Sequence, residues 1–108
     1  MTHIREEILV EAPVEHVWAY FCDVSRWPEW QPRMTFEDPS GPFDQVGTTV
    51  VQTGRLMGYE MTYTEKVVEV EPLRIIHSHF DDGPMDMFYR FAPEGDATRL
   101  IVESDYEM

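Results

Sequence analysis

The sequence predicts an α+β fold in which a short helical segment interrupts a chain that is otherwise made of strands. A strand-like run at residues 8–10 ends before Pro13, whose fixed φ suits the first turn of a helix. Apolar residues then recur at helical spacing, at Val14, Val17, Trp18 and Phe21. Beyond this segment, period-two alternation and short turns containing glycine predict strands almost to the end of the chain.

Two segments near the C-terminus show the alternation most clearly. Residues 85–91 place apolar side chains at every second position, and residues 100–106 follow a similar pattern. This period is expected where one face of a sheet is buried. The polar segments 81–84 and 93–96 each contain a glycine and join consecutive strand patterns, as hairpin turns do. An antiparallel meander is the simplest arrangement.

These features resemble the START-like helix-grip (SRPBCC) superfamily, in particular its polyketide cyclase/dehydrase-like branch. Residues 8–18 look like that family's first strand and helix, and residues 27–32 look like its second helix and exit. Residues 46–48, 67–72 and 89–100 resemble, in the same order, the entry to its third strand, its fourth strand and turn, and its last hairpin. The resemblance implies a curved antiparallel sheet of about six to seven strands, with two short helices after the first strand.

One departure from the family concerns its C-terminal helix, which crosses the concave sheet face and closes a ligand cavity. This sequence ends at Met108, and residues 103–108 still read as strand, so that helix is expected to be absent. Either the sequence is incomplete or something else covers the face. The side chains expected there are Ile4, Ile8, Val10, Met61, Tyr63, Met85, Met87, Tyr89, Phe91, Leu100, Val102 and Tyr106. Because a large exposed apolar face marks an interface or a ligand groove, we expect a homodimer.

Length and composition indicate a single domain spanning residues 1–108. A chain of 108 residues lies near the commonest domain size and leaves no room for a second core. Its single cysteine, Cys22, has no partner for an internal disulfide and is expected to be a buried thiol. No apolar run has the length of an export signal or of a membrane span, so a cytoplasmic location is the default expectation.

The charge balance narrows the expected partners. The chain carries 21 acidic and 8 basic residues, for a net charge of −13, and the basic residues are isolated among carboxylates. Nucleic acids require clustered Lys and Arg, so nucleic-acid binding is not expected. Anionic membranes are disfavoured for the same reason. The acidity fits a highly charged soluble surface, with adaptation to high salt as the alternative.

Two glutamates are expected on the apolar face of the sheet. Alternation along residues 59–67 places Glu65 on the same side as Tyr63, and alternation along residues 4–10 turns Glu6 inward. In the helix-grip arrangement their strands are well separated, at about 4.8 Å per strand step, so the two carboxylates are not expected to form an acid–base dyad.

A second grouping rests on the resemblance, which implies that the first strand pairs with the last. That pairing would bring Glu6 near Ser104 or Tyr106, with Tyr89 one strand further. A carboxyl in an apolar pocket has a raised pKa, and neighbouring phenols can orient or protonate a carbonyl, as an aldol cyclisation or dehydration requires. Glu6, Tyr89 and Tyr106 are therefore the candidate catalytic residues. The alternative is that Glu6, near the start of its strand, reaches water and has no catalytic role.

A cavity on the concave face would be lined by aromatic, Met and aliphatic side chains with a few polar groups, which suits a mostly apolar ligand. The candidate ligand-binding residues are Trp27, Met61, Tyr63, Glu65, Met85, Met87, Tyr89, Phe91, Val102 and Tyr106. Trp27 and Trp30 flank Pro28 beside the expected cavity mouth. We assign Trp30 to packing and leave Trp27 open between packing and a gating role, because both rings cannot face inward.

No metal or cofactor site is predicted. His77 and His79 lie on one face of a strand and could imitate a metal site with Asp81, but Ile76 and Phe80 make the better core side. The two histidines are therefore expected to face solvent, and no further ligands are apparent. Among the glycines, no pattern matches a phosphate-binding loop.

Three functions from different classes agree with these observations. The first, which we favour, is binding of a hydrophobic or aromatic small molecule in a cavity on the concave sheet face. The second is a cofactor-independent enzyme of the polyketide cyclase/dehydratase kind. The third is a protein-interaction module like the superfamily's chaperone-activator relatives. The resemblance implies a fold whose members share a cavity but not a reaction, so it does not select one activity.

Overall fold

The chain folds as a sheet with a helical segment after its first strand, and the computed structural model describes residues 2–31, 34–37, 39–56, 58–80 and 85–106. Strand β1 (Thr2–Val10) leads into α1 (Val14–Cys22), the 3-10 helix η1 (Val24–Arg26) and α2 (Trp27–Trp30). The remaining described elements are β2 (Met34–Glu37), β3 (Thr49–Leu56), β4 (Tyr59–Glu71), β5 (Ile75–Phe80), β6 (Met85–Glu94) and β7 (Ala97–Tyr106).

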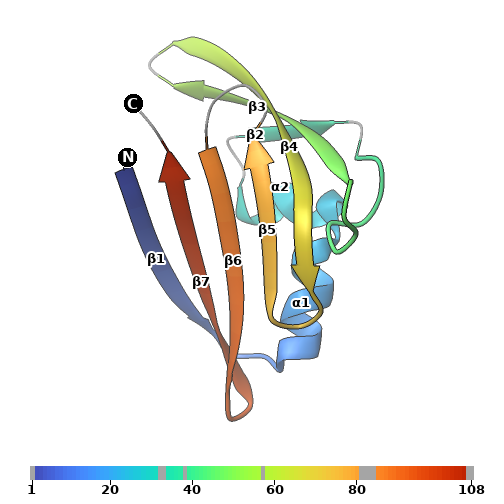
Figure 1. The fold of residues 1–108 in the computed structure, drawn as a ribbon, viewed down its shortest axis with the longest axis vertical. Helices are drawn as coiled ribbons and strands as arrows, with labels where there is room; N and C mark the ends of the chain where they lie inside the picture. The colour runs from blue at the N-terminus through green and yellow to red at the C-terminus, as the bar shows by residue number, and fades with distance from the viewer. Residues whose placement is uncertain (1, 32–33, 38, 57, 81–84, 107–108) are drawn as a thin grey trace.

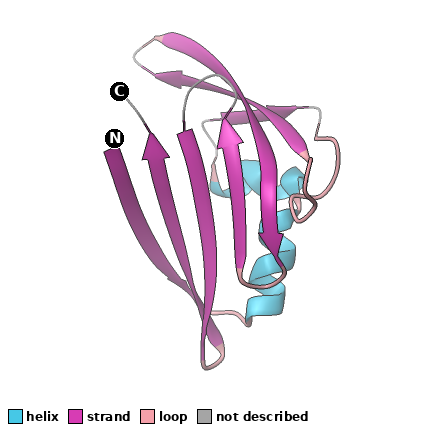
Figure 2. Ribbon diagram, in the orientation of Figure 1, coloured by secondary structure: helices cyan, strands magenta, loops and turns pink. Residues whose placement is uncertain are grey.

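The seven described strands form one antiparallel sheet in the order β1-β7-β6-β5-β4-β3-β2. The first strand pairs with the last, with Thr2 opposite Tyr106, so the two ends of the described chain lie side by side (Figure 1). Both α-helices lie on the same side of the curved sheet (Figure 2). The predicted α+β helix-grip class, with two short helices after the first strand, is confirmed. No helix follows β7 among the described residues.

Helix α1 begins after Pro13 and buries Val17, Trp18, Phe21 and Cys22 against the sheet. Its last carbonyl groups have no partner within the helix, so other parts of the chain must satisfy them. The Trp27 indole N–H donates to the Phe21 carbonyl at 2.7 Å, and the Phe43 N–H donates to the Cys22 carbonyl at 3.0 Å. These two bonds hold the chain that follows α1 against its C-terminal end.

The hydrophobic core fills the space between the helices and the concave face of the sheet. Residues of α1 and α2 pack there against Phe43 and against inward side chains of β3, β4, β5 and β6. Cys22 is buried, as predicted, and burial raises the pKa of its thiol to about 12. A thiol with so high a pKa stays protonated at neutral pH and is a poor nucleophile.

The pairing of β4 with β5 slips by one residue. Val67 pairs with Ser78 and Glu69 with His77, which leaves Val68 as an extra residue. A bulge of this kind bends a strand and increases its twist. In the β6–β7 hairpin, Gly95 has a φ of +62°, within the turn predicted at residues 93–96. The turn predicted at residues 81–84 lies outside the described residues.

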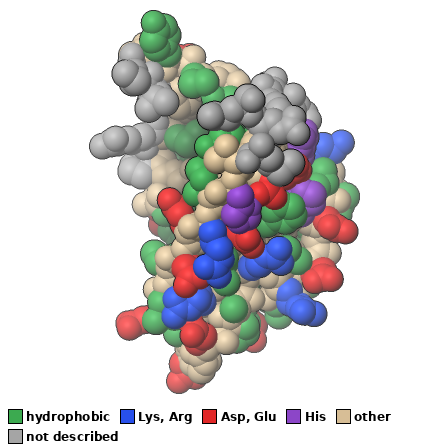
Figure 3. Space-filling model, turned by 60° about the vertical axis from the view of Figure 1, so that its left-hand side comes forward, with side chains coloured by type: hydrophobic (Ala, Val, Ile, Leu, Met, Phe, Trp, Pro, Cys, Tyr) green, Lys and Arg blue, Asp and Glu red, His purple; other side chains and the backbone are tan. Residues whose placement is uncertain are grey.

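The convex face of the sheet is charged. Arg90 on β6 pairs with Glu103 on β7 at 2.7 Å, and Arg99 on β7 pairs with Glu94 at 2.7 Å and with Glu7 on β1 at 3.4 Å. Basic, acidic and histidine side chains therefore lie next to one another on the surface, as Figure 3 shows. In the described part of the chain, no helix is long and apolar enough to cross a membrane.

Candidate functional site

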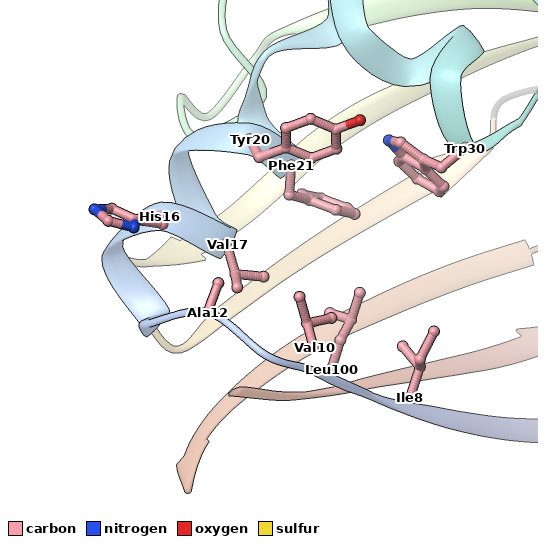
Figure 4. Close-up of a pocket in the computed structure, with 9 residues that line it drawn as sticks. All are labelled: Ile8, Val10, Ala12, His16, Val17, Tyr20, Phe21, Trp30 and Leu100. Atoms are coloured by element: carbon pink, nitrogen blue, oxygen red, sulfur yellow. The ribbon is translucent and has the colours of Figure 1, made fainter. Parts of the chain in front are cut away.

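A cavity of about 490 Å³ lies on the concave side of the sheet, between α1 and the paired strands β1 and β7 (Figure 4). Four residues of α1, one residue of α2, the inward residues of the two strands and Ala12, which lies between β1 and α1, enclose it. The lining residues are Ile8, Val10, Ala12, His16, Val17, Tyr20, Phe21, Trp30 and Leu100.

The sheet wall of the cavity follows from strand alternation and register. Ile8 pairs with Leu100 and Val10 with Thr98, so the two β1 residues and Leu100 share the concave face. Ala12 lies just beyond β1, and its carbonyl accepts a hydrogen bond from the Thr98 hydroxyl at 2.9 Å. This bond fixes the point at which the chain leaves the sheet and crosses to α1.

The helical wall is aromatic. Val17 and Phe21 lie four residues apart and therefore on one face of α1, with Tyr20 beside them. The Phe21 and Trp30 rings stack with centroids 5.7 Å apart and an angle of 26° between their planes. The two helices thus present a continuous aromatic surface to the apolar strand residues opposite.

Polar groups lie only at the edge of this cavity. The His16 ring points away from the other lining side chains (Figure 4). The Tyr20 hydroxyl donates to Glu29 Oε1 at 3.0 Å, and the Arg26 guanidinium lies 5.5 Å from the Tyr20 ring centroid. The rest of the lining is hydrocarbon apart from the Trp30 ring nitrogen.

Phe21 separates the cavity from a buried polar cluster. Its ring contacts the cavity on one side and lies 4.8 Å, centroid to centroid, from the Tyr89 ring on the other. The Tyr89 hydroxyl donates to Glu65 Oε2 at 2.8 Å, and Ser78 Oγ donates to the same oxygen at 2.5 Å. Gln52 Nε2 donates to Glu65 Oε1. The carboxyl group therefore accepts hydrogen bonds from three different strands.

Burial controls the protonation of this cluster. Glu65 is only 1% exposed, and this loss of water raises its pKa, although the bonds from Ser78, Tyr89 and Gln52 act in the opposite direction. The pKa of Tyr89 is raised well above its usual value by burial and by the neighbouring Glu65. A carboxyl with a raised pKa beside a phenol has the groups that general acid–base chemistry requires.

The candidate catalytic residues from the sequence do not come together as one cluster. Glu6 lies opposite Val102, which in turn lies opposite Tyr89, so a whole strand separates the two. Of the two neighbours expected for Glu6, Ser104 lies opposite Ile4, two residues along the strand, and Tyr106 lies opposite Thr2, four residues along it. Glu6 is exposed, and the hydroxyl of Tyr89 is bonded to Glu65 instead.

The candidate ligand-binding residues share the concave side but lie beside the cavity, not in its lining. Glu65, Tyr89, Phe91 and Trp27 are buried in the core. The others are half-buried or exposed further along the same face, and they are Met61, Tyr63, Met85, Met87, Val102 and Tyr106. Tyr63 and Met61 contact each other through a 3.3 Å hydroxyl–sulfur bond.

The two tryptophans of α2 lie in different surroundings: Trp27, which the sequence left open between packing and gating, is packed in the core, and Trp30, which it assigned to packing, also lines the cavity. Trp27 is 1% exposed and packs against Phe36 and Phe43, with ring centroids 5.2 and 4.8 Å away. Trp30 is 41% exposed and lines the cavity. The Trp27 side chain is inward because its N–H satisfies the end of α1, a contact that sequence spacing does not reveal.

The histidine pair lies on the convex face, away from the cavity. Ile76 is on the core side, as predicted, while His77 Nε2 and His79 Nδ1 lie 2.9 and 3.1 Å from Asp86 Oδ1. Burial alone would raise the pKa of Asp86, but the two histidines lower it overall. Asp81 is outside the described residues, and within the described ranges no group of metal-ligating side chains is arranged to hold a metal ion.

None of the nine lining residues was among the candidate ligand-binding residues, and six of them were not placed on the apolar sheet face either: Ala12, His16, Val17, Tyr20, Phe21 and Trp30. The helical periodicity identified Val17 and Phe21 but indicated only a core stripe. Helical periodicity could not show that the side of α1 facing β1 is left uncovered by the sheet. Ile8, Val10 and Leu100 were correctly expected on the apolar face.

Comparison with known proteins identifies relatives of the whole chain. The family model for polyketide cyclase/dehydrase and lipid transport proteins matches residues 1–108. No curated protein matches the chain in sequence.

Several solved structures share the fold. A protein from Thermus thermophilus is 20% identical with a TM-score of 0.83, and the match covers 99% of this chain and 75% of that one. The Zhui aromatase/cyclase of a Streptomyces species is 20% identical with a TM-score of 0.78, over 98% of this chain and 67% of that one. Norcoclaurine synthase from Thalictrum flavum, solved with dopamine and hydroxybenzaldehyde, is 18% identical with a TM-score of 0.73, over 97% and 68% of the two chains.

Proposed function

The chain belongs to the polyketide cyclase/dehydrase and lipid transport family, and from that premise we propose that its cavity binds an apolar or aromatic small molecule. The observation that carries this proposal is the hydrocarbon lining between α1 and the β1–β7 pair. Its volume of about 490 Å³ falls within the range of small-molecule sites. Stacked Phe21 and Trp30 rings favour a flat aromatic group, because offset and edge contacts between rings add to simple burial.

Two structural relatives support an aromatic ligand. One is an aromatase/cyclase, and the other was solved with dopamine and hydroxybenzaldehyde, both of which are aromatic. At sequence identities of 20% and 18%, these relatives share the fold of this chain, but the identities do not specify its ligand.

Fluorescence titration with the neutral apolar probe N-phenyl-1-naphthylamine tests the binding function. We expect saturable binding at one site per chain. Ile8→Glu should lower the affinity at least about tenfold, because it places a charge in an apolar wall. Ile8 is 58% exposed, so the change should leave the fold intact.

Two variants control this experiment. Leu9→Glu alters the next residue of β1, which is 47% exposed on the opposite face, and Ile4→Glu alters the same face outside the cavity lining. Leu9→Glu should bind the probe as the wild type does, and Ile4→Glu should lose less affinity than Ile8→Glu because it lies outside the lining. Equal loss in all three variants, or no binding by the wild-type protein, would contradict a ligand site at this cavity.

A second candidate function is a cofactor-independent cyclase or dehydratase. The observation that favours it is the buried Glu65–Tyr89 pair directly behind Phe21, with the pKa of Glu65 raised by burial. In an aldol cyclisation with dehydration, such a pair could move a proton from the attacking carbon and to the departing hydroxyl.

Turnover of a synthetic linear poly-β-ketone ester, followed by the absorbance of an aromatic product, tests this alternative. Tyr89→Phe should abolish turnover while probe binding persists. Glu6→Gln distinguishes the two acid–base groups: retained turnover assigns the carboxyl role to Glu65, and lost turnover assigns it to Glu6. Unchanged turnover in Tyr89→Phe would contradict the enzyme assignment.

A further inference from the structure

Two exposed lining residues, Tyr20 and Trp30, each carry one polar atom at the edge of the cavity. The Tyr20 hydroxyl oxygen comes from α1, and the Trp30 ring nitrogen comes from α2. Figure 4 shows the Tyr20 hydroxyl directed toward the side of the Trp30 ring that carries the nitrogen. Both side chains line the cavity and are substantially exposed. A ligand bound against Phe21 would therefore place one end between them.

The direction of the Tyr20 hydrogen bond determines what that end can be. Its single O–H proton is donated to Glu29 Oε1 at 3.0 Å, so the oxygen offers the cavity only lone pairs. The bond to Glu29 also raises the pKa of Tyr20, which keeps the phenol protonated. Tyr20 can accordingly accept a hydrogen bond from a ligand.

Trp30 has the complementary property. An indole N–H is a donor only, and among the described residues no hydrogen bond occupies that of Trp30. A ligand group that donates to Tyr20 and accepts from Trp30 at the same time satisfies both. A neutral hydroxyl has one donor and two acceptor sites and meets this requirement, whereas a carboxylate has no proton to donate.

Charge around the mouth acts against anions as well. Arg26 lies 3.8 Å from Glu29 and 3.5 Å from Asp23, so one cation is shared between two carboxylates. Glu6 adds another carboxylate on the concave face, two residues from Ile8. A negatively charged ligand group would approach a net negative surface.

We propose that the cavity selects apolar ligands that end in a neutral hydroxyl, held between Tyr20 and Trp30, and that Glu29 excludes ligands ending in a carboxylate. This inference rests on the proposed binding function and names the chemical class of its ligand. Glu29 acts in two ways, by orienting the Tyr20 proton away from the cavity and by contributing negative charge beside it.

Competition against N-phenyl-1-naphthylamine with naphthalene, 2-naphthol and 2-naphthoate tests the proposal, because the three compounds share one ring system. We expect 2-naphthol to bind about tenfold more tightly than naphthalene, and 2-naphthoate to bind more weakly than both. Tyr20→Phe and Trp30→Phe should each lower the ratio of 2-naphthol affinity to naphthalene affinity, which is measured within the same variant so that a general change in cavity binding cancels.

Glu29→Gln tests the exclusion of anions, and Glu15→Gln is its matched control. Both variants remove one negative charge, but Glu15 is exposed in the first turn of α1 and does not line the cavity. We expect 2-naphthoate to bind about three to tenfold more tightly to Glu29→Gln and to bind unchanged to Glu15→Gln.

The outcomes separate this inference from the function on which it rests. If none of the compounds and no probe binds, both the proposed function and the ligand class are wrong. If naphthalene binds but 2-naphthol has no advantage, or 2-naphthoate binds equally well, binding stands and the hydroxyl selection is overturned. Equal effects of Glu29→Gln and Glu15→Gln would overturn the role of Glu29.

Discussion

Glu65 is the ionisable residue whose surroundings differ most from water. It is 1% exposed, and its two oxygens accept hydrogen bonds from Gln52, Ser78 and Tyr89. Gln52 and Ser78 lie on the strands next to β4, and Tyr89 lies one strand further on β6, so the carboxyl joins β3, β4, β5 and β6 on the concave side. The same hydroxyls can turn to accept when the carboxyl is protonated, which lets the network persist in both states.

The raised pKa of Glu65 predicts how stability changes with pH. Between the ordinary carboxyl pKa of 4.5 and its higher folded value, the native protein retains a proton that the unfolded chain has lost. The contribution of Glu65 to the free energy of unfolding is therefore full below pH 4.5 and declines as the pH rises through the folded pKa. Glu65→Gln should lose less stability than the wild type between pH 4.5 and neutral pH.

Urea unfolding over this pH range measures the effect. Glu71→Gln, an exposed change at the end of the same strand, should follow the wild-type profile. Parallel profiles for the wild type and Glu65→Gln would show that Glu65 does not titrate differently on folding.

Tyr89→Phe should lower the free energy of unfolding by about 1–3 kcal/mol at neutral pH, because it removes a donor from a buried carboxyl.

At the scale of elements, α2 connects the core to the cavity although it contains only four residues. Trp27 packs inward and its N–H holds the end of α1, while Trp30 stacks on Phe21 at the cavity. Pro28 occupies an early helical position, where its missing N–H costs little. The two tryptophans of this single helical turn therefore have different roles: Trp27 stabilises the core and Trp30 lines the cavity.

Exchanging each tryptophan for phenylalanine should separate these roles. Trp27→Phe leaves the Phe21 carbonyl without its donor and opens space in the core, so we expect a loss of about 2 kcal/mol or more. Trp30→Phe changes an exposed ring and should cost less than about 1 kcal/mol. Chemical denaturation measures both, and an equal loss would contradict this division.

At the scale of the whole molecule, the two faces of the sheet have different chemistry. The convex face carries cross-strand ion pairs such as Arg90–Glu103. The concave face is covered by helices only in part, and Ile4, Ile8 and Met61 remain between 41% and 58% exposed on it. Where such exposed apolar surface is contiguous, it usually marks an interface or a ligand groove.

We propose that two copies of the chain associate through the uncovered part of the concave face. Size-exclusion chromatography with light scattering at micromolar concentration should give the mass of a dimer. Ile4→Glu should shift it to a monomer, because it buries a charge in an apolar contact. Leu9→Glu, with similar exposure on the convex side of the same strand, should remain dimeric. A monomeric wild-type protein would contradict the proposal.

The order and type of the elements could be predicted because they depend on local patterns. The stripe at Val17 and Phe21 identified α1, and alternation placed Glu65 and Tyr89 on the inner face before any contact was known. The resemblance to known proteins then gave the pairing of the first strand with the last. Each of these inferences uses residues that are near one another in the sequence, or a pattern extending over the whole chain.

The sequence by itself determined which side chains face the core, and the tertiary structure decided which of them meet. Alternation has a period of two, so a strand can slide by two residues without changing its faces, and only the full set of contacts selects the register. In the register that forms, Val102 lies opposite Glu6, and the Tyr89 hydroxyl donates to Glu65. That choice of register also left the cavity between α1 and β1, because the helix covers β6 more closely than the edge strand.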